Sequence, residues 1–269
     1  MIRLPDVPLP AEALASLAEY QREVDAQPDY AARVTRAKER FSALNKKGTK
    51  TIESVKATLG KMNSGVRRCA YCEDSFADEL DHFRPKTLYP ELVFAWANYL
   101  YACGHCNGSK TDHFAVFAEG TGVLTSVARK RNAPVIPPVP GRAVFIDPRV
   151  EDPTEYLSLD LADTFWFVPR AKLGMVERAR AEYTIRELQL NIRDWLPQAR
   201  RSAYWDYLAH LKGFVRDKAQ GLPRVHLDRL AQEIRGRQHP TVWFEMKRQH
   251  AVLPELTLLF AEAPEALTW

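Results

Sequence analysis

The sequence predicts a mainly helical α+β protein in which a small, turn-rich segment separates two helical regions. Apolar residues recur every three or four positions over residues 30–62 and again over residues 194–250, as they do on the buried side of amphipathic helices. Residues 69–120 break this rhythm with turns, aromatic residues and short strand-like pieces such as residues 79–83. The chain's only four cysteines lie in this middle segment.

Three helices are expected in the N-terminal region. The first follows Pro10, and the second begins after Asp29, whose side chain can cap it. The third follows a turn at residues 45–49. Their apolar stripes are, in chain order, Leu14, Leu17, Ala18 and Val24; Tyr30, Val34, Ala37, Phe41 and Leu44; and Ile52, Val55, Leu59 and Met62.

The remaining chain is expected to form a connector and a second helical region. Prolines at residues 134–140 favour an extended segment, because proline cannot join a helix interior. Short strands are expected at residues 143–147 and 164–168. A long helix should start at Asp194 and end near Gly221, with further helices at residues 225–235 and 241–250. The predicted division is therefore 1–64 basic and helical, 65–120 the cysteine-bearing unit, 121–142 the Pro-rich connector and 143–269 mostly helical.

Charge is distributed unevenly along the chain although the net charge is only +4. Residues 33–68 contain eleven Lys and Arg against two acids, whereas residues 69–120 contain eight acids against three Lys and Arg. A basic stretch beside an acidic one suits a polyanion track next to a cation site, although basic helices are equally often solvated faces. No apolar run reaches the roughly 18–20 residues of a membrane span, and nothing resembles a signal peptide. A cytoplasmic location is therefore expected.

The cysteines form two matched pairs, Cys69-x-x-Cys72 and Cys103-x-x-Cys106. Each pair can supply two ligands from one tight turn, and four thiolates satisfy zinc at the corners of a tetrahedron. Such a shell has no open position for water, so the predicted zinc is structural. A redox role for the C-x-x-C pairs is the weaker alternative.

Polar residues between and after these pairs carry a resemblance to a known family. The pattern joins the cysteine pairs to Asp81-His82-Phe-Arg84-Pro-Lys86, Trp96-x-Asn98-Tyr-Leu100 and Cys106-Asn107-x-x-Lys110. It resembles the HNH endonucleases, which contain a ββα-metal finger. The stretch around residues 81–91 is similar in particular to the HNH nucleases of bacterial antiphage systems of the Septu and retron-associated type, which are encoded beside an ATPase.

This resemblance implies a catalytic set made of His82, Asp81, Asn98 and Asn107. His82 would be the general base, and Asn98 would fix the loop that orients it. Asp81 and Asn107 would hold a catalytic Mg²⁺ or Mn²⁺ ion. Many members carry histidine at the position of Asn107, and the oxygen ligand here favours Mg²⁺ or Mn²⁺ over Zn²⁺. Phosphate contacts are expected from Arg84, Lys86 and Lys110.

The sequence therefore predicts a metal-dependent endonuclease that hydrolyses phosphodiester bonds, with DNA preferred over RNA as the substrate, acting in antiphage defence. The resemblance also implies an ATPase partner subunit. The alternative is a non-catalytic zinc-knuckle module that binds nucleic acid or protein, which requires the four polar residues to match the nuclease pattern by coincidence.

Overall fold

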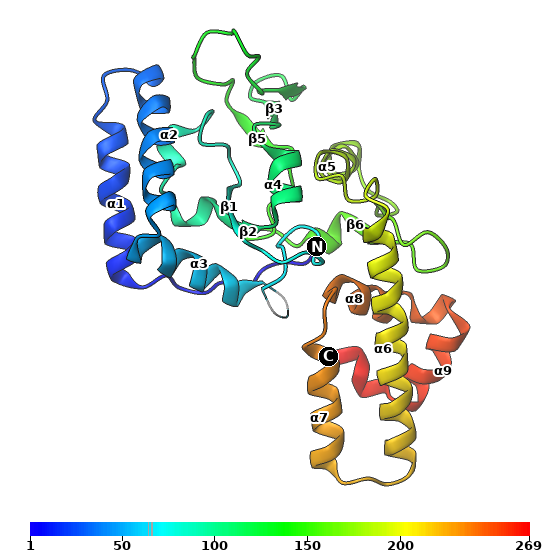
Figure 1. The fold of residues 1–269 in the computed structure, drawn as a ribbon. Helices are drawn as coiled ribbons and strands as arrows, with labels where there is room; N and C mark the ends of the chain where they lie inside the picture. Colours follow the sequence, from blue (N-terminus) through cyan, green and yellow to red (C-terminus); the bar gives the residue numbers. More distant parts are fainter. Residues whose placement is uncertain (64, 66) are drawn as a thin grey trace.

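The computed structural model describes residues 1–63, 65 and 67–269 of the chain. Helices make up most of its regular structure, as predicted, and small antiparallel sheets lie between them (Figure 1). The helices are α1 (Ala11–Asp25), α2 (Tyr30–Lys47), α3 (Lys50–Met62), α4 (Gly104–Lys110), α5 (Met175–Glu187), α6 (Trp195–Ala219), α7 (Arg224–Arg235), α8 (Pro240–Gln249) and α9 (Pro254–Glu262). The strands are β1 (Glu79–His82), β2 (Tyr99–Ala102), β3 (Ala115–Ala118), β4 (Leu124–Ser126), β5 (Gly141–Ala143), β6 (Leu157–Leu159) and β7 (Phe167–Pro169).

The three N-terminal helices lie where the sequence predicts them, but the predicted stripe of α1 is only partly buried, because Leu14 and Ala18 are exposed. The Asp29 carboxylate accepts a hydrogen bond from the Ala32 amide at 2.8 Å and so caps α2. The apolar stripe of α2 is buried, and Gly48 ends the helix with a positive φ of 60°. Helix α3 packs against α1 and against β2. The N-terminal helices therefore lie directly against the middle segment.

The middle segment forms an antiparallel hairpin followed by a short helix. Strand β1 pairs with β2 in the register Glu79↔Ala102 and His82↔Tyr99, and α4 starts two residues after β2 and contacts β1. The long connection between the two strands contains 3₁₀ turns at Pro90–Leu92 and Trp96–Asn98. The two cysteine pairs flank this hairpin, one before β1 and one after β2.

A second sheet crosses the predicted domain boundaries. Its strand order is β4-β3-β5. Strand β3 belongs to the predicted 65–120 unit; it pairs on one side with β4, which lies in the predicted connector, and on the other side with β5. The close approach at β5 requires glycine, because a Cβ on Gly141 would lie 2.2 Å from the Phe117 carbonyl oxygen. The Pro-rich segment thus returns the chain to the same sheet and does not separate two units. The predicted boundary at 64/65 lies beside residues 64 and 66, which are outside the described residues.

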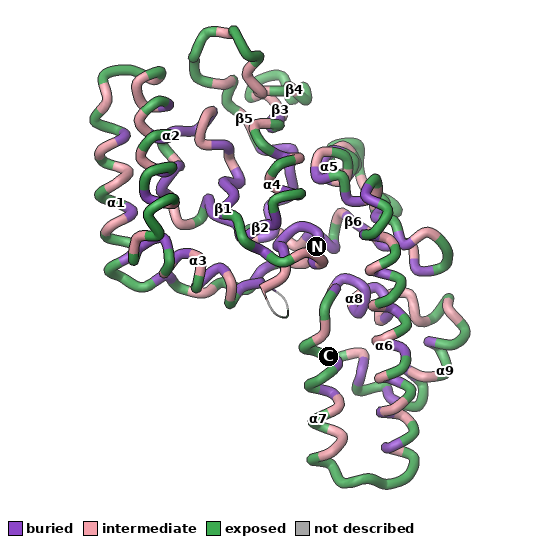
Figure 2. Tube along the Cα trace, viewed as in Figure 1, coloured by how far each residue is buried: buried purple, intermediate pink, exposed green. Residues whose placement is uncertain are grey.

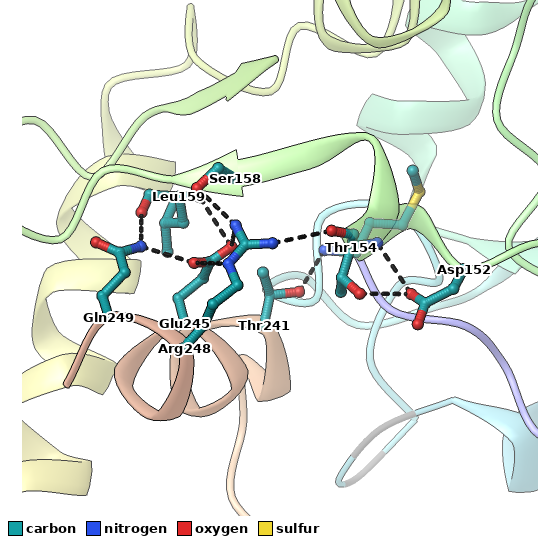
Figure 3. Close-up of polar contacts among 9 residues, drawn as sticks. Asp152, Thr154, Ser158, Leu159, Thr241, Glu245, Arg248 and Gln249 are labelled. Carbon is teal, nitrogen blue, oxygen red and sulfur yellow. Dashed lines mark hydrogen bonds and ion pairs between the residues drawn. The ribbon is translucent and has the colours of Figure 1, made fainter. Parts of the chain in front are cut away.

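The C-terminal region contains the predicted long helix α6, with α7 and α8 close to their expected positions; helices α5 and α9 were not predicted. A buried polar network ties α8 to β6 (Figure 3). The fully buried Glu245 carboxylate accepts from the Leu159 amide at 3.2 Å and from the Arg248 guanidinium. Arg248 also donates to the Ser158 hydroxyl at 2.6 Å and the Thr154 carbonyl at 2.9 Å.

One continuous set of buried apolar residues joins these regions. It extends from Leu4 and Leu17 through the hairpin residues Tyr99 and Leu100 to Phe260 near the end of the chain. Figure 2 shows buried residues running from the N-terminal helices through the hairpin to α8. Among the described residues, no helix combines the length and apolar character that crossing a membrane requires.

Candidate metal centre and catalytic cavity

The four cysteines meet in one buried cluster. Their Sγ atoms all lie within 4.8 Å of one another, and those of Cys72 and Cys103 are 3.9 Å apart. Tetrahedral zinc with Zn–S bonds of about 2.3 Å holds its sulfur ligands about 3.8 Å apart, so the cluster fits zinc. It is the only group of three or more His, Cys, Asp or Glu side chains with this proximity in residues 1–63, 65 and 67–269. The prediction of a cysteine metal centre agrees with this geometry.

Two N–H groups donate hydrogen bonds to the cysteine sulfur atoms. The Tyr71 amide donates to the Cys69 sulfur at 3.4 Å, and the Arg193 guanidinium donates to the Cys106 sulfur at 3.2 Å. Four thiolates around Zn²⁺ carry a net charge of −2, which a buried guanidinium partly neutralises. Arg193 lies 87 residues from Cys106 in the sequence, and no local pattern indicated this contact.

His82 is buried at the end of β1 with one ring nitrogen fixed. Its Nε2 lies 3.0 Å from the Val93 carbonyl oxygen, and its ring centroid lies 4.5 Å from that of Phe41. Because a carbonyl only accepts hydrogen bonds, Nε2 carries the hydrogen and Nδ1 keeps a free lone pair. Burial, followed by the nearby Lys86 charge, lowers the pKa of His82 well below its usual value. The imidazole is therefore neutral at neutral pH, in the state that can accept a proton.

Asn98 holds the two ends of the β1–β2 connection together. Its Oδ1 accepts from the Arg84 amide at 2.8 Å, and its Nδ2 donates to the carbonyls of Arg84 and Leu92, each at 3.0 Å. The Leu92 carbonyl immediately precedes Val93, whose own carbonyl holds His82 and also accepts from the Tyr99 hydroxyl at 2.7 Å. The geometry thus gives Asn98 contacts to the loop that fixes the histidine ring.

Asp81 precedes His82 on β1, and its carboxylate has two strong partners. The Tyr71 hydroxyl donates to its Oδ2 at 2.5 Å, and the Lys110 ammonium donates to its Oδ1 at 3.0 Å. Lys110 is fully buried and also donates to the His82 carbonyl at 2.6 Å. The expected phosphate contact of Lys110 disagrees with this burial, because its ammonium faces Asp81 and not solvent.

A cavity of about 440 Å³ opens beside His82. Lys86, Asn107 and Asp81 line it, as the sequence led us to expect for site residues. Lys38 from α2 and Glu79 from the start of β1 also line it, and neither was singled out from the sequence. The Asn107 side-chain amide donates to Glu79 Oε2 at 2.6 Å, so its own carbonyl oxygen stays available. Burial lowers the pKa of Lys86, whose ammonium lies 5.4 Å from the centre of the Phe41 ring.

Arg84 does not line the His82 cavity. Its guanidinium lies over the Tyr89 ring at 4.9 Å, and the residue lines a second cavity on the other side of the segment. Of the three predicted phosphate-binding residues, only Lys86 therefore shares a cavity with His82. Lys38 was noted in the sequence only as part of a basic stretch, but it lines this cavity, whereas Arg84 and Lys110 do not.

Comparison with known proteins gives one partial similarity. The chain is 41% identical over 64 residues to the Septu protein PtuB of Bacillus thuringiensis, a match that covers 22% of this chain and 24% of that protein. The match thus spans about a quarter of the relative's length. No protein-family profile matches the chain. The chain therefore has partial similarity to a Septu protein, and its four-cysteine cluster is able to bind zinc.

Proposed function

We propose that this protein is a metal-dependent endonuclease of the HNH type that hydrolyses phosphodiester bonds of nucleic acid, with DNA as the first substrate to test. One observation carries the proposal: a neutral imidazole with Nε2 fixed by a carbonyl lines a cavity together with two lysines. A fixed base beside cationic side chains suits the attack of water on a phosphodiester. A zinc-knuckle binding module has no need of this arrangement.

The residues divide the reaction among them. Nδ1 of His82 takes a proton from the attacking water while the new oxygen–phosphorus bond forms and the bond to the leaving 3′-oxygen breaks. Solvent returns a proton to that oxygen. The ammonium groups of Lys38 and Lys86 attract the phosphate and offset the charge that builds on its oxygens.

The pair of residues that we propose as ligands of a catalytic cation differs from the pair Asp81 and Asn107, which the resemblance implies. Asp81 already bonds to Lys110 and Tyr71, so its carboxylate does not fit as an open metal ligand. The Asn107 carbonyl and the exposed Glu79 carboxylate offer oxygen atoms inside the His82 cavity. We therefore propose that Asn107 and Glu79 bind Mg²⁺ or Mn²⁺. Asp81 stays paired with the buried Lys110 and does not bind the cation. Oxygen ligands suit these cations, which would supply charge neutralisation at the phosphate.

The biological role that we propose is antiphage defence with an ATPase partner. The partial similarity to a Septu protein supports it, as does the sequence resemblance around Asp81 and His82. The trigger and the cleaved nucleic acid would then depend on the complex. Tests of activity must for this reason include the partner encoded beside the gene.

The decisive experiment measures nicking of supercoiled plasmid, and cleavage of transfer RNA in parallel, with Mg²⁺ or Mn²⁺. The chain is assayed alone and after co-expression with its neighbouring ATPase. We expect cleavage by the wild type, a loss of at least about a hundredfold in His82→Ala, and wild-type rates in His113→Ala. His113 is a matched control because it is exposed and faces Glu187 of α5, away from the cavity. Equal rates for wild type and His82→Ala, or no cleavage with any metal and partner, would contradict the proposal.

A Glu79→Gln and Asp81→Asn pair tests the cation ligands. We expect Glu79→Gln to raise the Mg²⁺ concentration that gives half-maximal cleavage, with the fold unchanged. Asp81→Asn should instead lower stability, because it breaks a buried ion pair. If only Asp81→Asn changes the metal requirement, Asp81 is the ligand and Lys110 must move away from it.

A further inference from the structure

A second cavity, of about 530 Å³, lies on the other side of the segment that contains His82. This segment contributes to both cavities: His82, Pro85 and Lys86 line the first, whereas Phe83 and Arg84 line the second. The volume is in the range of sites that hold small organic ligands. Nothing in the proposed hydrolysis uses this cavity.

The walls of the second cavity are largely apolar. Phe83, Leu92, Phe145 and Val150 contribute, with three alanines between them. Because the two phenylalanines are themselves nearly completely buried, the apolar surface that this wall offers to a ligand comes mainly from the exposed Val150 and the half-buried Leu92. A flat, apolar group can remove these surfaces from water without rearranging them.

Only some of the charged side chains that line the cavity form ion pairs. Arg180 and Glu151 form an ion pair, and Arg180 also donates to the backbone carbonyls of Val144 and Phe145, so both are committed to the fold. Arg84 and Arg142 form no ion pair with any described residue. Because Asp147 is the remaining acid, the unpaired groups sum to a charge of +1 when it is ionised, which favours an anionic ligand.

Asp147 offers a hydrogen-bond acceptor at the same place. Its Oδ1 accepts from the Arg149 amide at 3.0 Å, and no described residue donates to its Oδ2. Burial raises the pKa of Asp147 to about 6, so near neutral pH it is a largely ionised carboxylate that is poorly solvated. Such a group gains from a ligand that brings N–H donors.

We propose that this second cavity binds one unpaired nucleotide. The base lies against Leu92 and Val150, its N–H groups donate to Asp147, and its phosphate faces Arg84 and Arg142. Guanine presents two adjacent N–H donors to one carboxylate and is the preferred base, whereas uracil presents one. A purely apolar ligand would leave the Asp147 Oδ2 atom and the Arg142 guanidinium without a partner among the described residues.

The cavity also contacts the loop that holds the candidate base. Asn98 lines it and bonds to both the amide and the carbonyl of Arg84. A bound nucleotide therefore touches the connection that carries the Val93 carbonyl and, through it, His82. The nucleotide can come from a strand bound across the His82 cavity, which rests on the proposed nuclease function, or from the free pool.

The test measures binding of GMP, UMP and inorganic phosphate to the full chain by isothermal titration calorimetry. We expect saturable binding of GMP, weaker binding of UMP, and a loss of at least about tenfold for GMP in Arg142→Gln and in Asp147→Asn. Arg170→Gln, which changes an exposed arginine outside the cavity, should bind GMP as the wild type does. Thermal unfolding of each variant shows that the fold is retained.

His82→Ala separates this proposal from the nuclease proposal. It should bind GMP normally, so failure of cleavage and failure of nucleotide binding are distinguishable. To identify the source, a short single strand is titrated with and without saturating GMP: competition indicates a nucleotide of the strand, and independent binding indicates a free nucleotide. No GMP binding, binding that Arg142→Gln leaves unchanged, or equal binding of phosphate alone would overturn the proposal.

Discussion

His82 owes its chemical state to residues that lie far apart in the sequence. Phe41 of α2 covers the ring, Val93 fixes Nε2, and the Lys86 charge adds to the effect of burial. Burial and the Lys86 charge disfavour the protonated imidazole and lower the pKa of His82, whereas the hydrogen bond to Val93 acts in the opposite direction and is outweighed. The residue type was evident from the sequence, but its protonation depends on this surrounding shell.

We predict that His82 does not titrate near its ordinary pKa of about 6.5. An unfolded chain takes up a proton there and the folded chain does not, so this residue makes stability fall as pH drops from about 6.5 toward the lowered folded pKa. Ring signals followed by NMR against pH should stay at the neutral position through this window. Unfolding in urea should show less acid sensitivity in His82→Gln than in wild type; a ring midpoint near 6.5 would contradict the prediction.

Lys110 and Asp81 form a buried ion pair whose rupture should be costly. Lys110→Met leaves the Asp81 carboxylate buried without a cation, and we expect it to lower the free energy of unfolding by about 3–5 kcal/mol. Lys46→Met, at an exposed position of α2, should change it by less than about 0.5 kcal/mol. Urea unfolding measures both, and adding Asp81→Asn to Lys110→Met should recover part of the loss. If Lys110→Met left the free energy of unfolding unchanged, the Lys110 ammonium would not be paired with Asp81 in solution.

At the scale of elements, a helix with a regular apolar stripe such as α2 was predictable, whereas α5, which has none, was not. Helix α2 shows a regular apolar stripe and a capping Asp29, and both are present in the structure. Helix α5 instead buries Arg180, Ala181 and Thr184 and exposes its Met175, so its sequence carries no apolar stripe. One of its buried positions is filled by the Arg180 guanidinium, which pairs with Glu151, a partner 29 residues away. The three-residue strands depend on pairing across the chain in the same way, and the β4-β3-β5 sheet was missed for this reason.

The hairpin β1–β2 and helix α4 should depend on zinc for their arrangement. We predict one zinc per chain by elemental analysis, and substantial loss of it in Cys106→Ser together with a lower melting temperature. Ser109→Ala, on the same helix and outside the cluster, is the control. Mild EDTA should remove a weakly bound catalytic cation and leave the circular dichroism spectrum unchanged. Full zinc content in Cys106→Ser would contradict a four-cysteine site.

At the scale of the whole molecule, the sequence singled out several residues of the candidate site but not Lys38 and Glu79, which also line its cavity. Asp81, His82, Asn98 and Asn107 lie within one stretch, and the resemblance to the HNH endonucleases grouped them. Lys38 reaches the same cavity from α2, and Arg149 donates from the far side to the carbonyls of Trp96 and Tyr99. These contacts follow from how distant elements pack, which a single sequence does not specify. The predicted division into regions stays a prediction, and one set of buried apolar residues runs through all of them.

The packing of α2 against the hairpin leads to a prediction about nucleic-acid binding. Lys38 brings a basic helix to the edge of the His82 cavity, so it should contact a phosphate of bound substrate. Each neutralised phosphate of duplex DNA contributes about 0.9 to the slope of log affinity against log salt. In the His82→Ala background, which prevents cleavage during the measurement, Lys38→Gln should reduce that slope by about 1, whereas Lys61→Gln, exposed on α3 and outside the cavity, should not change it. Fluorescence anisotropy of a labelled duplex across a salt series gives both slopes. Equal slopes for the two variants would mean that α2 faces solvent or a partner protein and that the substrate reaches His82 from another side.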